Sequence, residues 1–317
     1  MNKEKQLSQK VITGLQKTIY KYYKTHKREL PWRKTRNPYH ILVSEVMLQQ
    51  TQVPRVIEKY NQFLHRFPTI DDLAKASLRE VLATWLGLGY NRRALSLKKL
   101  AEKVTADYNG VVPQSVELLQ TLPGIGTTTA SSIAAFAWNY PSVFIETNIR
   151  SVFIYFFFRK QQNVSDEDIL PLVEQTLDRK NPRLWYWALM DYGVILKKIY
   201  KNPSRKSLQY KKQKPFKNSD RQIRGAILKI ITTQPLSPPS RNPRVINPRM
   251  KRSKSASADF RSDRSRTKIP RAKSPRSFNF LELSHHFATT HQRIAKIFKT
   301  LEEEGFIIRK GKRYTIS

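Results

Sequence analysis

Apolar residues recur at helical spacing through most of residues 1–216, and this periodicity constrains the fold more than any other feature. The segments that carry it are Val11–Tyr23, His40–Leu48, Val53–Phe67, Leu73–Trp85, Ala94–Val104, Ser131–Trp138 and Leu184–Ile199. Ser77–Glu80 and Ser165–Asp168 have the spacing of capping boxes, which satisfy the amides at a helix start. Val143–Ile145 and Val152–Phe158 are β-branched or aromatic, but the surrounding helices favour buried helix there as well. The sequence therefore predicts a mainly α-helical domain over residues 1–216.

The composition changes abruptly near residue 236. From about 236 to 277 the chain consists largely of Ser, Pro, Arg and Lys, which cannot bury enough apolar surface to offset chain entropy. We expect this basic insert to be disordered. Helical patterns occur on both sides of it, and the chain ends in an apparent hairpin that turns at Lys310-Gly311. The helices are predicted at Ser219–Thr233, Phe280–Phe287 and Thr290–Glu304. Three helices and a hairpin are typical of a winged helix, predicted here over 217–317.

The charge of the chain indicates a polyanionic partner. Lys and Arg number 59 against 24 Asp and Glu, which gives a formal charge of +35. Such a field attracts DNA or RNA, and a membrane surface is the rival. No apolar run approaches the roughly 18 residues that span a bilayer, and the first ten residues lack the apolar centre of a secretory signal. We therefore expect a soluble, cytoplasmic protein (nucleoid-associated if bacterial) that does not bind membranes.

The chain contains no cysteine. This excludes a disulfide, a thiol nucleophile, a cysteine zinc site and a cysteine-ligated iron–sulfur cluster. We predict no cofactor and no metal site.

Glu45 is the first candidate for chemistry. On a helix its neighbours Ile41, Leu42 and Leu48 place its carboxylate against an apolar face. Desolvation raises a carboxyl pKa, which suits a general acid that works near neutral pH. A buried glutamate paired with an arginine is an equally good interpretation of the periodicity alone.

The segment Leu122–Ala130 joins two helices in a predicted hairpin near 117–138. Gly124 and Gly126 allow backbone amides to converge before a helix start, which forms a nest for a phosphate. An ordinary helix–turn–helix connector is the alternative. The polar residues Glu146-Thr147-Asn148, inside an otherwise apolar stretch, strengthen the functional interpretation.

Four motifs together carry a family resemblance. They are Pro31-Trp32-Arg33, the decapeptide SEVMLQQTQV at 44–53, LGLGY at 86–90 and LPGIG at 122–126. In this order and spacing they resemble the A/G-specific adenine DNA glycosylases (MutY-type) of the helix-hairpin-helix base-excision superfamily. The resemblance covers about residues 28 to 200 and implies the two-lobed helical fold of that superfamily.

The resemblance implies a role for each matching residue. Glu45 matches the general acid that protonates N7 of a flipped adenine, and Glu146 and Asn148 match the second catalytic pair. The residues that would line the base pocket or wedge into the duplex are Trp32, Arg33, Gln49, Gln50, Tyr90 and Asp191. Those that would hold a backbone phosphate are Leu122, Gly124, Gly126, Thr127 and Thr128.

The chain departs from the family pattern at three positions of the glycosylase domain. Glu146 stands where the family has an aspartate, one methylene shorter. Thr128 stands where bifunctional relatives have the lysine that forms a Schiff base, so we expect no lyase activity. Lys197 stands where the first cysteine of the family's iron–sulfur cluster would lie.

The winged helix stands where the family carries a domain that inspects 8-oxoguanine. We expect auxiliary DNA contacts from a recognition helix with Arg293 and Lys296, and from a wing with Lys310, Lys312 and Arg313. A protein-interaction module is the alternative. The basic insert is predicted to tether the protein to DNA, with a passive linker or an RNA-binding tail as alternatives.

The resulting prediction is a monofunctional glycosylase that removes adenine from A·G or A·8-oxoguanine mispairs. Duplex DNA with a mispair is the expected partner, and the protein is expected to be a monomer. One alternative is a T·G or U·G glycosylase on the same scaffold, and another is a non-catalytic mismatch-binding protein.

Overall fold

The computed structural model describes residues 6–213, 215–233, 283–284, 287–310 and 313–317 of the chain. The basic insert at 236–277, most of the helix expected at Phe280–Phe287, and Lys312 lie outside these residues. The helices before residue 214 are α1 (Gln9–His26), η1 (Pro31–Arg33), α2 (Pro38–Leu48), α3 (Val53–Arg66), α4 (Ile70–Lys75), α5 (Leu78–Trp85), α6 (Arg92–Tyr108), α7 (Val116–Gln120), α8 (Thr127–Trp138), α9 (Thr147–Phe157), α10 (Asp166–Thr176), α11 (Pro182–Ile199) and η2 (Pro203–Lys206). The mainly α-helical prediction is confirmed.

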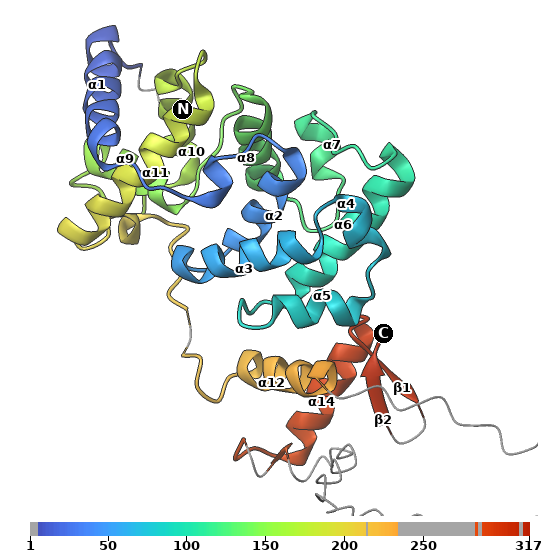
Figure 1. Cartoon of the computed structure of the whole chain (residues 1–317). Helices are drawn as coiled ribbons and strands as arrows, with labels where there is room; N and C mark the ends of the chain where they lie inside the picture. The colour runs from blue at the N-terminus through green and yellow to red at the C-terminus, as the bar shows by residue number, and fades with distance from the viewer. Residues whose placement is uncertain (1–5, 214, 234–282, 285–286, 311–312) are drawn as a thin grey trace, which may run out of the picture.

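The helices pack around two apolar cores. One core joins residues of α1, α9, α10 and α11, and the other joins residues of α2 to α8. Figure 1 shows α1, α9, α10 and α11 on one side of the molecule and α4 to α7 on the other. Helices α2 and α8 contribute to both cores, since Ile41 and Ala135 belong to the first and Val46 and Ile133 to the second. These two helices therefore run through the place where the lobes meet.

The capping boxes predicted at Ser77 and Ser165 are present, and each begins a helix. A third one at Thr69 was not expected, and it begins α4. The single helix predicted over Leu73–Trp85 is wrong, because the chain breaks at Ala76 (ψ 146°) and α5 begins anew after Ser77. The Ser77 side chain accepts a hydrogen bond from the Glu80 amide, which favours a new helix start over continuation.

The helix expected at Val143–Ile145 is also wrong, whereas Val152–Phe158 is helical as far as Phe157. Residues 141–146 form an extended connection between the end of α8 and Glu146, which caps α9. Phe144 and Ile145 are buried in this connection. Their apolar character therefore reflects burial of a loop and not a helical period.

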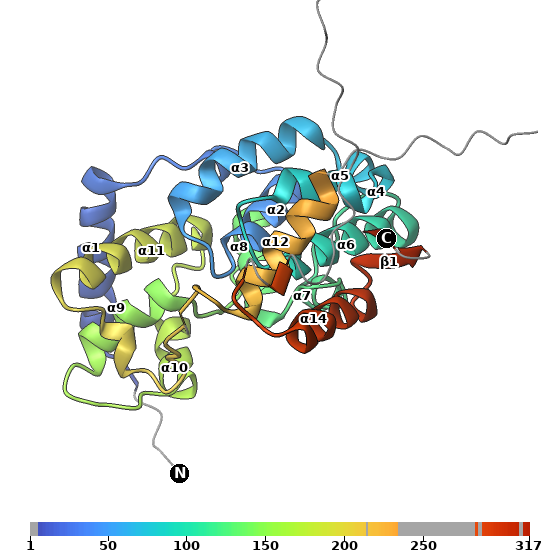
Figure 2. The same cartoon turned by 90° about the horizontal axis from the view of Figure 1, so that it is seen from below.

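The C-terminal residues pack on the second core. Helices α12 (Asp220–Thr233) and α14 (His291–Glu303) and strands β1 (Ile307–Lys310) and β2 (Arg313–Ile316) contribute to it. The strands pair antiparallel with Ile307 opposite Ile316, so the predicted hairpin is present. Figures 1 and 2 both place these elements beside α5 and α6, away from α1 and α9. The domain boundary at 216/217 stays a prediction.

The C-terminal elements are also held by ion pairs. Glu304, at the end of α14, pairs with Arg92 at the start of α6 and with Arg224 of α12. Burial by itself raises the pKa of the Glu304 carboxyl, but hydrogen bonds and charge from the two arginines outweigh it and lower the pKa to about 2. Within the described part of the chain, no helix combines the length and the apolar character needed to cross a membrane.

Candidate active site

Glu45 lies on α2 and faces α8, where the two lobes meet. The Ser132 hydroxyl of α8 lies 2.6 Å from Glu45 Oε2 and 3.0 Å from the Thr129 carbonyl oxygen. Ser132 is 3% exposed, so this contact joins the two helices in a dry environment. Among the described residues, the glutamate therefore has Ser132 as a fixed neighbour and no arginine as an ion-pair partner, the alternative that the sequence left open.

Burial raises the pKa of Glu45 to about 7. The Ser132 hydrogen bond and the charge of Arg33 oppose this rise, and the charge of Glu146 adds to it. The protein thus holds this carboxyl near half protonation at neutral pH, the range in which a general acid is most effective.

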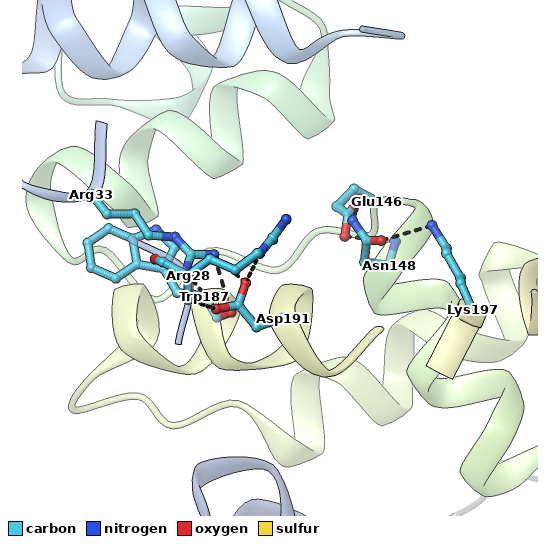
Figure 3. Close-up of polar contacts among 7 residues, drawn as sticks. All are labelled: Arg28, Arg33, Glu146, Asn148, Trp187, Asp191 and Lys197. Carbon is cyan, nitrogen blue, oxygen red and sulfur yellow. Dashed lines mark hydrogen bonds and ion pairs between the residues drawn. The ribbon is translucent and has the colours of Figure 1, made fainter. Parts of the chain in front are cut away.

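Arg33 and Asp191 form a buried ion pair next to this glutamate. Arg33 of η1 donates through both terminal nitrogens to Asp191 of α11, at 2.8 and 2.9 Å. Arg28 adds its backbone amide at 2.9 Å and its Nε at 2.5 Å. The Arg33 guanidinium also lies 5.5 Å from the centre of the Trp187 ring. Figure 3 shows the Arg33 and Trp187 side chains next to each other. The cluster ties η1 to α11.

The Asp191 carboxylate is 2% exposed and accepts four hydrogen bonds, which fill its roughly four lone-pair sites. Burial alone raises its pKa, but the hydrogen bonds and charge of Arg33, helped by Arg28, leave the pKa below the ordinary value. In this arrangement Asp191 orients Arg33. The base contact expected of both residues stays a prediction.

Glu146 caps α9 with its own side chain. Its Oε1 accepts from the backbone amides of Asn148 (2.8 Å) and Ile149 (3.0 Å), and its Oε2 accepts from Asn148 Nδ2 (2.9 Å). Lys197 of α11 donates to Asn148 Oδ1 at 2.8 Å. Figure 3 shows these three side chains in a row, beside the Arg33–Asp191 cluster. The Glu146 carboxylate therefore both caps α9 and contacts the Asn148 amide.

The hairpin between α7 and α8 has the expected turn. Gly124 has φ +82°, and a Cβ there would lie 2.7 Å from Ser96 Cβ, so both its backbone and its surroundings require glycine. Leu122 is 2% exposed and anchors the turn. Gly126 caps α8 without a side chain, so the first amides of that helix remain available to an anion.

Thr127 and Thr128 are exposed in the first turn of α8, next to these amides. The Thr127 hydroxyl donates to Gln120 Oε1 at 2.9 Å. Thr128 offers a hydroxyl where an amine would be needed for Schiff-base chemistry.

Gln49 and Gln50 follow α2, and Tyr90 ends the 86–90 turn. Gln49 Nε2 donates to Thr129 Oγ1 at 3.2 Å. Gln50 and Tyr90 both have left-handed φ values, 54° and 48°. The Tyr90 hydroxyl accepts from Gln213 at 2.5 Å and Arg221 at 2.7 Å. The wedge candidates are thus brought to one region, and Tyr90 contacts the start of the C-terminal elements.

Arg93 holds the two wedge segments together. It donates to the carbonyl oxygens of Val46 (2.9 Å), Met47 (2.7 Å) and Gly89 (3.1 Å). Loss of water around it lowers the pKa of its guanidinium to about 10. The arginine therefore caps the end of α2 and fixes the turn that presents Tyr90.

Other predicted site residues lie away from this centre or have different neighbours. Trp32 is 6% exposed, and its ring packs edge-to-face on Tyr60, 5.5 Å away, in the second core. Arg293 of α14 binds Asp220 and the Asn218 carbonyl oxygen. Lys296 and Lys310 are exposed. For Arg313 the structure describes the backbone, which begins β2.

A cavity of about 480 Å³ borders Arg33 and Trp187. Its other basic lining residues are Lys34, Arg36 and Arg183. Since neither Glu45 nor Glu146 lines it, this cavity is not the catalytic pocket.

Sequence reasoning missed Ser132, Arg28 and Arg93, and noted Lys197 only as a replaced cysteine. Ser132 had a signal, since it is polar within the apolar period of α8. The arginines had none, because their partners are 46 to 163 residues away along the chain.

Known proteins resemble this chain in sequence and in structure. Residues 43–180 match the HhH-GPD superfamily of base excision DNA repair proteins. Three adenine DNA glycosylases are similar in sequence. That of Buchnera aphidicola (strain Bp) is 36% identical over 179 residues, 55% of this chain and 50% of its own. That of Mycobacterium tuberculosis is 43% identical over 132 residues, which make up 41% of this chain and 43% of the relative. The human protein is 34% identical over 197 residues, which make up 58% of this chain and 36% of the human one.

The chain thus spans half or less of the length of these three relatives. A thermostable thymine-DNA glycosylase is similar in structure, with a TM-score of 0.54 and 28% identity over 59% of this chain and 87% of that one. An endonuclease III in complex with DNA has a TM-score of 0.50 and 20% identity, over 58% of this chain and 85% of that one. This similarity shows a shared fold. The similarity to the HhH-GPD superfamily of base excision DNA repair proteins thus lies in residues 43–180.

Proposed function

We propose that this protein is a monofunctional DNA glycosylase that removes mispaired adenine, from A·G or A·8-oxoguanine, in base excision repair. The observation that carries the proposal is the Glu45 carboxyl, buried against Ser132 with a pKa near 7 and acted on by the charges of Arg33 and Glu146. At neutral pH about half of such carboxyls carry a proton that a leaving group can take. Because Glu45 sits inside the protein, the adenine must leave the base stack to reach it.

The reaction follows from these groups. Protonated Glu45 donates to N7 of the adenine, the glycosidic bond breaks with its electron pair on the base, and adenine leaves neutral. The sugar becomes oxocarbenium-like, and water adds to its anomeric carbon with loss of a proton. Among the described residues, Asn148 is the one hydrogen-bond donor to Glu146 Oε2, which leaves this oxygen a lone pair for that water. Its negative charge stabilises the cationic sugar.

The relatives support adenine as the base. All three curated proteins reported above carry the name adenine DNA glycosylase. Arg33, held by Asp191 and lying over Trp187, places a positive charge close enough to act on Glu45. The thymine-DNA glycosylase makes mispaired thymine the second candidate.

We further propose that the enzyme acts without an iron–sulfur cluster, because the chain has no cysteine, and without lyase activity, because Thr128 supplies no amine. The hairpin amides before α8 would bind a phosphate, and Gln49 and Tyr90 would fill the gap that the flipped base leaves. The high positive charge supports binding to duplex DNA. We propose that the protein acts as a monomer in the cytoplasm and, in a bacterium, at the nucleoid.

Base release under single-turnover conditions tests this proposal. We would compare end-labelled duplexes that carry A·G, A·8-oxoguanine, T·G, U·G and paired A·T. Strand cleavage at adenine only after alkali is the expected result. Cleavage without alkali would contradict the monofunctional assignment. Release from T·G alone would select the thymine alternative, and tight mispair binding without any release would indicate a non-catalytic protein.

The pH dependence of release is a direct test of Glu45. The acid is active when protonated, so the single-turnover rate should be highest below pH 7 and fall about tenfold per pH unit well above it. The sign follows from the raised pKa, since an ordinary glutamate would already be deprotonated near pH 5. The duplex dissociation constant, measured at each pH, is the control. A flat profile between pH 6 and 9 would rule out Glu45 as the proton donor.

A further inference from the structure

Lys197 is a charged side chain next to the catalytic pair that the mechanism above does not use. Its ammonium lies 2.8 Å from Asn148 Oδ1, and Asn148 Nδ2 lies 2.9 Å from Glu146 Oε2. Figure 3 shows Lys197 reaching from α11 toward Asn148, with Glu146 on the far side of the amide. The asparagine amide is thus placed between a cation and an anion.

This arrangement allows one orientation of the amide. A lysine ammonium can only donate hydrogen bonds, and an ionised glutamate can only accept them. The amide oxygen must therefore face Lys197, and its NH₂ group must face Glu146. A flipped amide would set its oxygen against the Glu146 carboxylate and its NH₂ group against the ammonium.

Helix α11 supports the same contact with its backbone. A Cβ at Gly193 would lie 2.4 Å from the Asn148 carbonyl oxygen, so α11 passes directly over Asn148 at this point. Lys197 follows Gly193 by four residues and lies on the same face of α11. The absence of a side chain at Gly193 brings the Lys197 stem within reach of the amide.

Lys197 is also partly dehydrated. Burial lowers the pKa of its ammonium below the ordinary lysine value, and the charge of Glu146 partly opposes this effect, while Arg150 and Arg28 add to it. A half-buried ammonium needs partners inside the protein, and Asn148 supplies one.

We propose that Lys197 is a positioning residue for base excision, which fixes the amide of Asn148 and thereby holds Glu146 Oε2 at the reacting sugar. The proposal rests on the function proposed above. Two effects compete when Lys197 is removed. The amide loses its fixed orientation, which slows the reaction, and Glu146 loses a nearby cation, which alone would favour a cationic sugar. The orientation effect wins, because the Asn148 NH₂ group holds Glu146 Oε2, whereas the backbone amides of Asn148 and Ile149 hold Oε1.

The test compares Lys197→Met with Lys197→Arg and Lys198→Met. Single-turnover adenine release from A·G duplex should fall about tenfold in Lys197→Met, with the duplex dissociation constant within about twofold of wild type. Lys197→Arg keeps a cationic donor and should recover most of the rate. Lys198 is the next residue, exposed on the same helix, so Lys198→Met removes equal charge without touching Asn148 and should leave the rate unchanged.

An Asn148→Ala background separates positioning from general support of the fold. If Lys197 acts through Asn148, Lys197→Met should slow Asn148→Ala no further. Equal losses in both backgrounds, a rate increase in Lys197→Met, or a loss that follows melting temperature would each overturn the proposal. Wild-type protein that releases no base from any duplex would overturn the proposed function and this inference together. Release by wild type with an unchanged Lys197→Met rate would overturn this inference alone.

Discussion

Replacing Glu45 with glutamine is expected to lower single-turnover adenine release by about 10²- to 10⁴-fold, the usual contribution of a positioned general acid. Glutamine has nearly the same shape and can still accept the Ser132 hydrogen bond, but its amide has no proton to give to N7. The measurement is the rate of alkali-dependent cleavage of an A·G duplex with enzyme in excess.

Duplex binding and stability are the controls for this variant. The dissociation constant for a mispaired duplex should change little, since Glu45 acts on the flipped base and not on the phosphates. The free energy of unfolding should not fall, because the glutamine cannot ionise and so carries no charge to bury at high pH. A variant that binds normally yet retains more than about a tenth of the wild-type rate would remove Glu45 from the mechanism.

The placement of Glu45 could be predicted because it depends on local periodicity. Residues three and four positions away on α2 are apolar, and this alone places the carboxylate against the core. The family motif then supplied its role. The contact with Ser132 could not be predicted, because it joins residues 87 positions apart through the packing of α2 on α8.

Helix boundaries were predictable where a local signal decides them. The Ser165 capping box correctly predicted the start of α10. At Leu73–Trp85 the apolar residues keep their helical spacing across a break in the helix. The capping box at Ser77 lies inside this segment and is the better predictor of the new helix start. Val143–Ile145 could not be distinguished from helix, since a buried loop and a buried helix need the same apolar side chains.

The change from aspartate to Glu146 was noticed in the sequence, but its use as a helix cap was not. Glutamate is not among the favoured N-cap residues, so no propensity rule predicts it. Lys197 was visible only as a missing cysteine. Its contact with Asn148 depends on how α11 crosses α9, which the sequence pattern does not contain.

Asp191→Asn is expected to have the largest effect on stability, about 3 to 5 kcal/mol of lost unfolding free energy. The Arg33 side chain is only 7% exposed and Asp191 is its one ion-pair partner among the described residues. Asparagine keeps the volume of aspartate, but it loses the negative charge and replaces one accepting oxygen with an NH₂ group that faces donors of Arg28 and Arg33. Arg33 would then carry a buried charge without compensation. Chemical denaturation at pH 7 measures the loss.

The pH dependence of this difference identifies its cause. The pKa of Asp191 is lower in the folded protein than its ordinary value, so its stabilisation is present at neutral pH. That stabilisation is lost as pH falls below about 4 and through the lowered pKa. The gap between wild type and Asp191→Asn should therefore narrow in acid. A gap that stays constant down to pH 2 would point to altered packing instead.

An exposed ion pair provides the matched control. Arg179 and Glu174 are 3.2 Å apart, and each side chain is 59% exposed. Glu174→Gln should change the unfolding free energy by less than about 1 kcal/mol, because solvent screens this pair. Asp191→Asn should also move the basic limb of the release profile to lower pH, since an unbalanced Arg33 charge favours ionised Glu45. Both effects come from one ion pair, so a variant that is destabilised but keeps its pH profile would show that Arg33 does not act on the general acid.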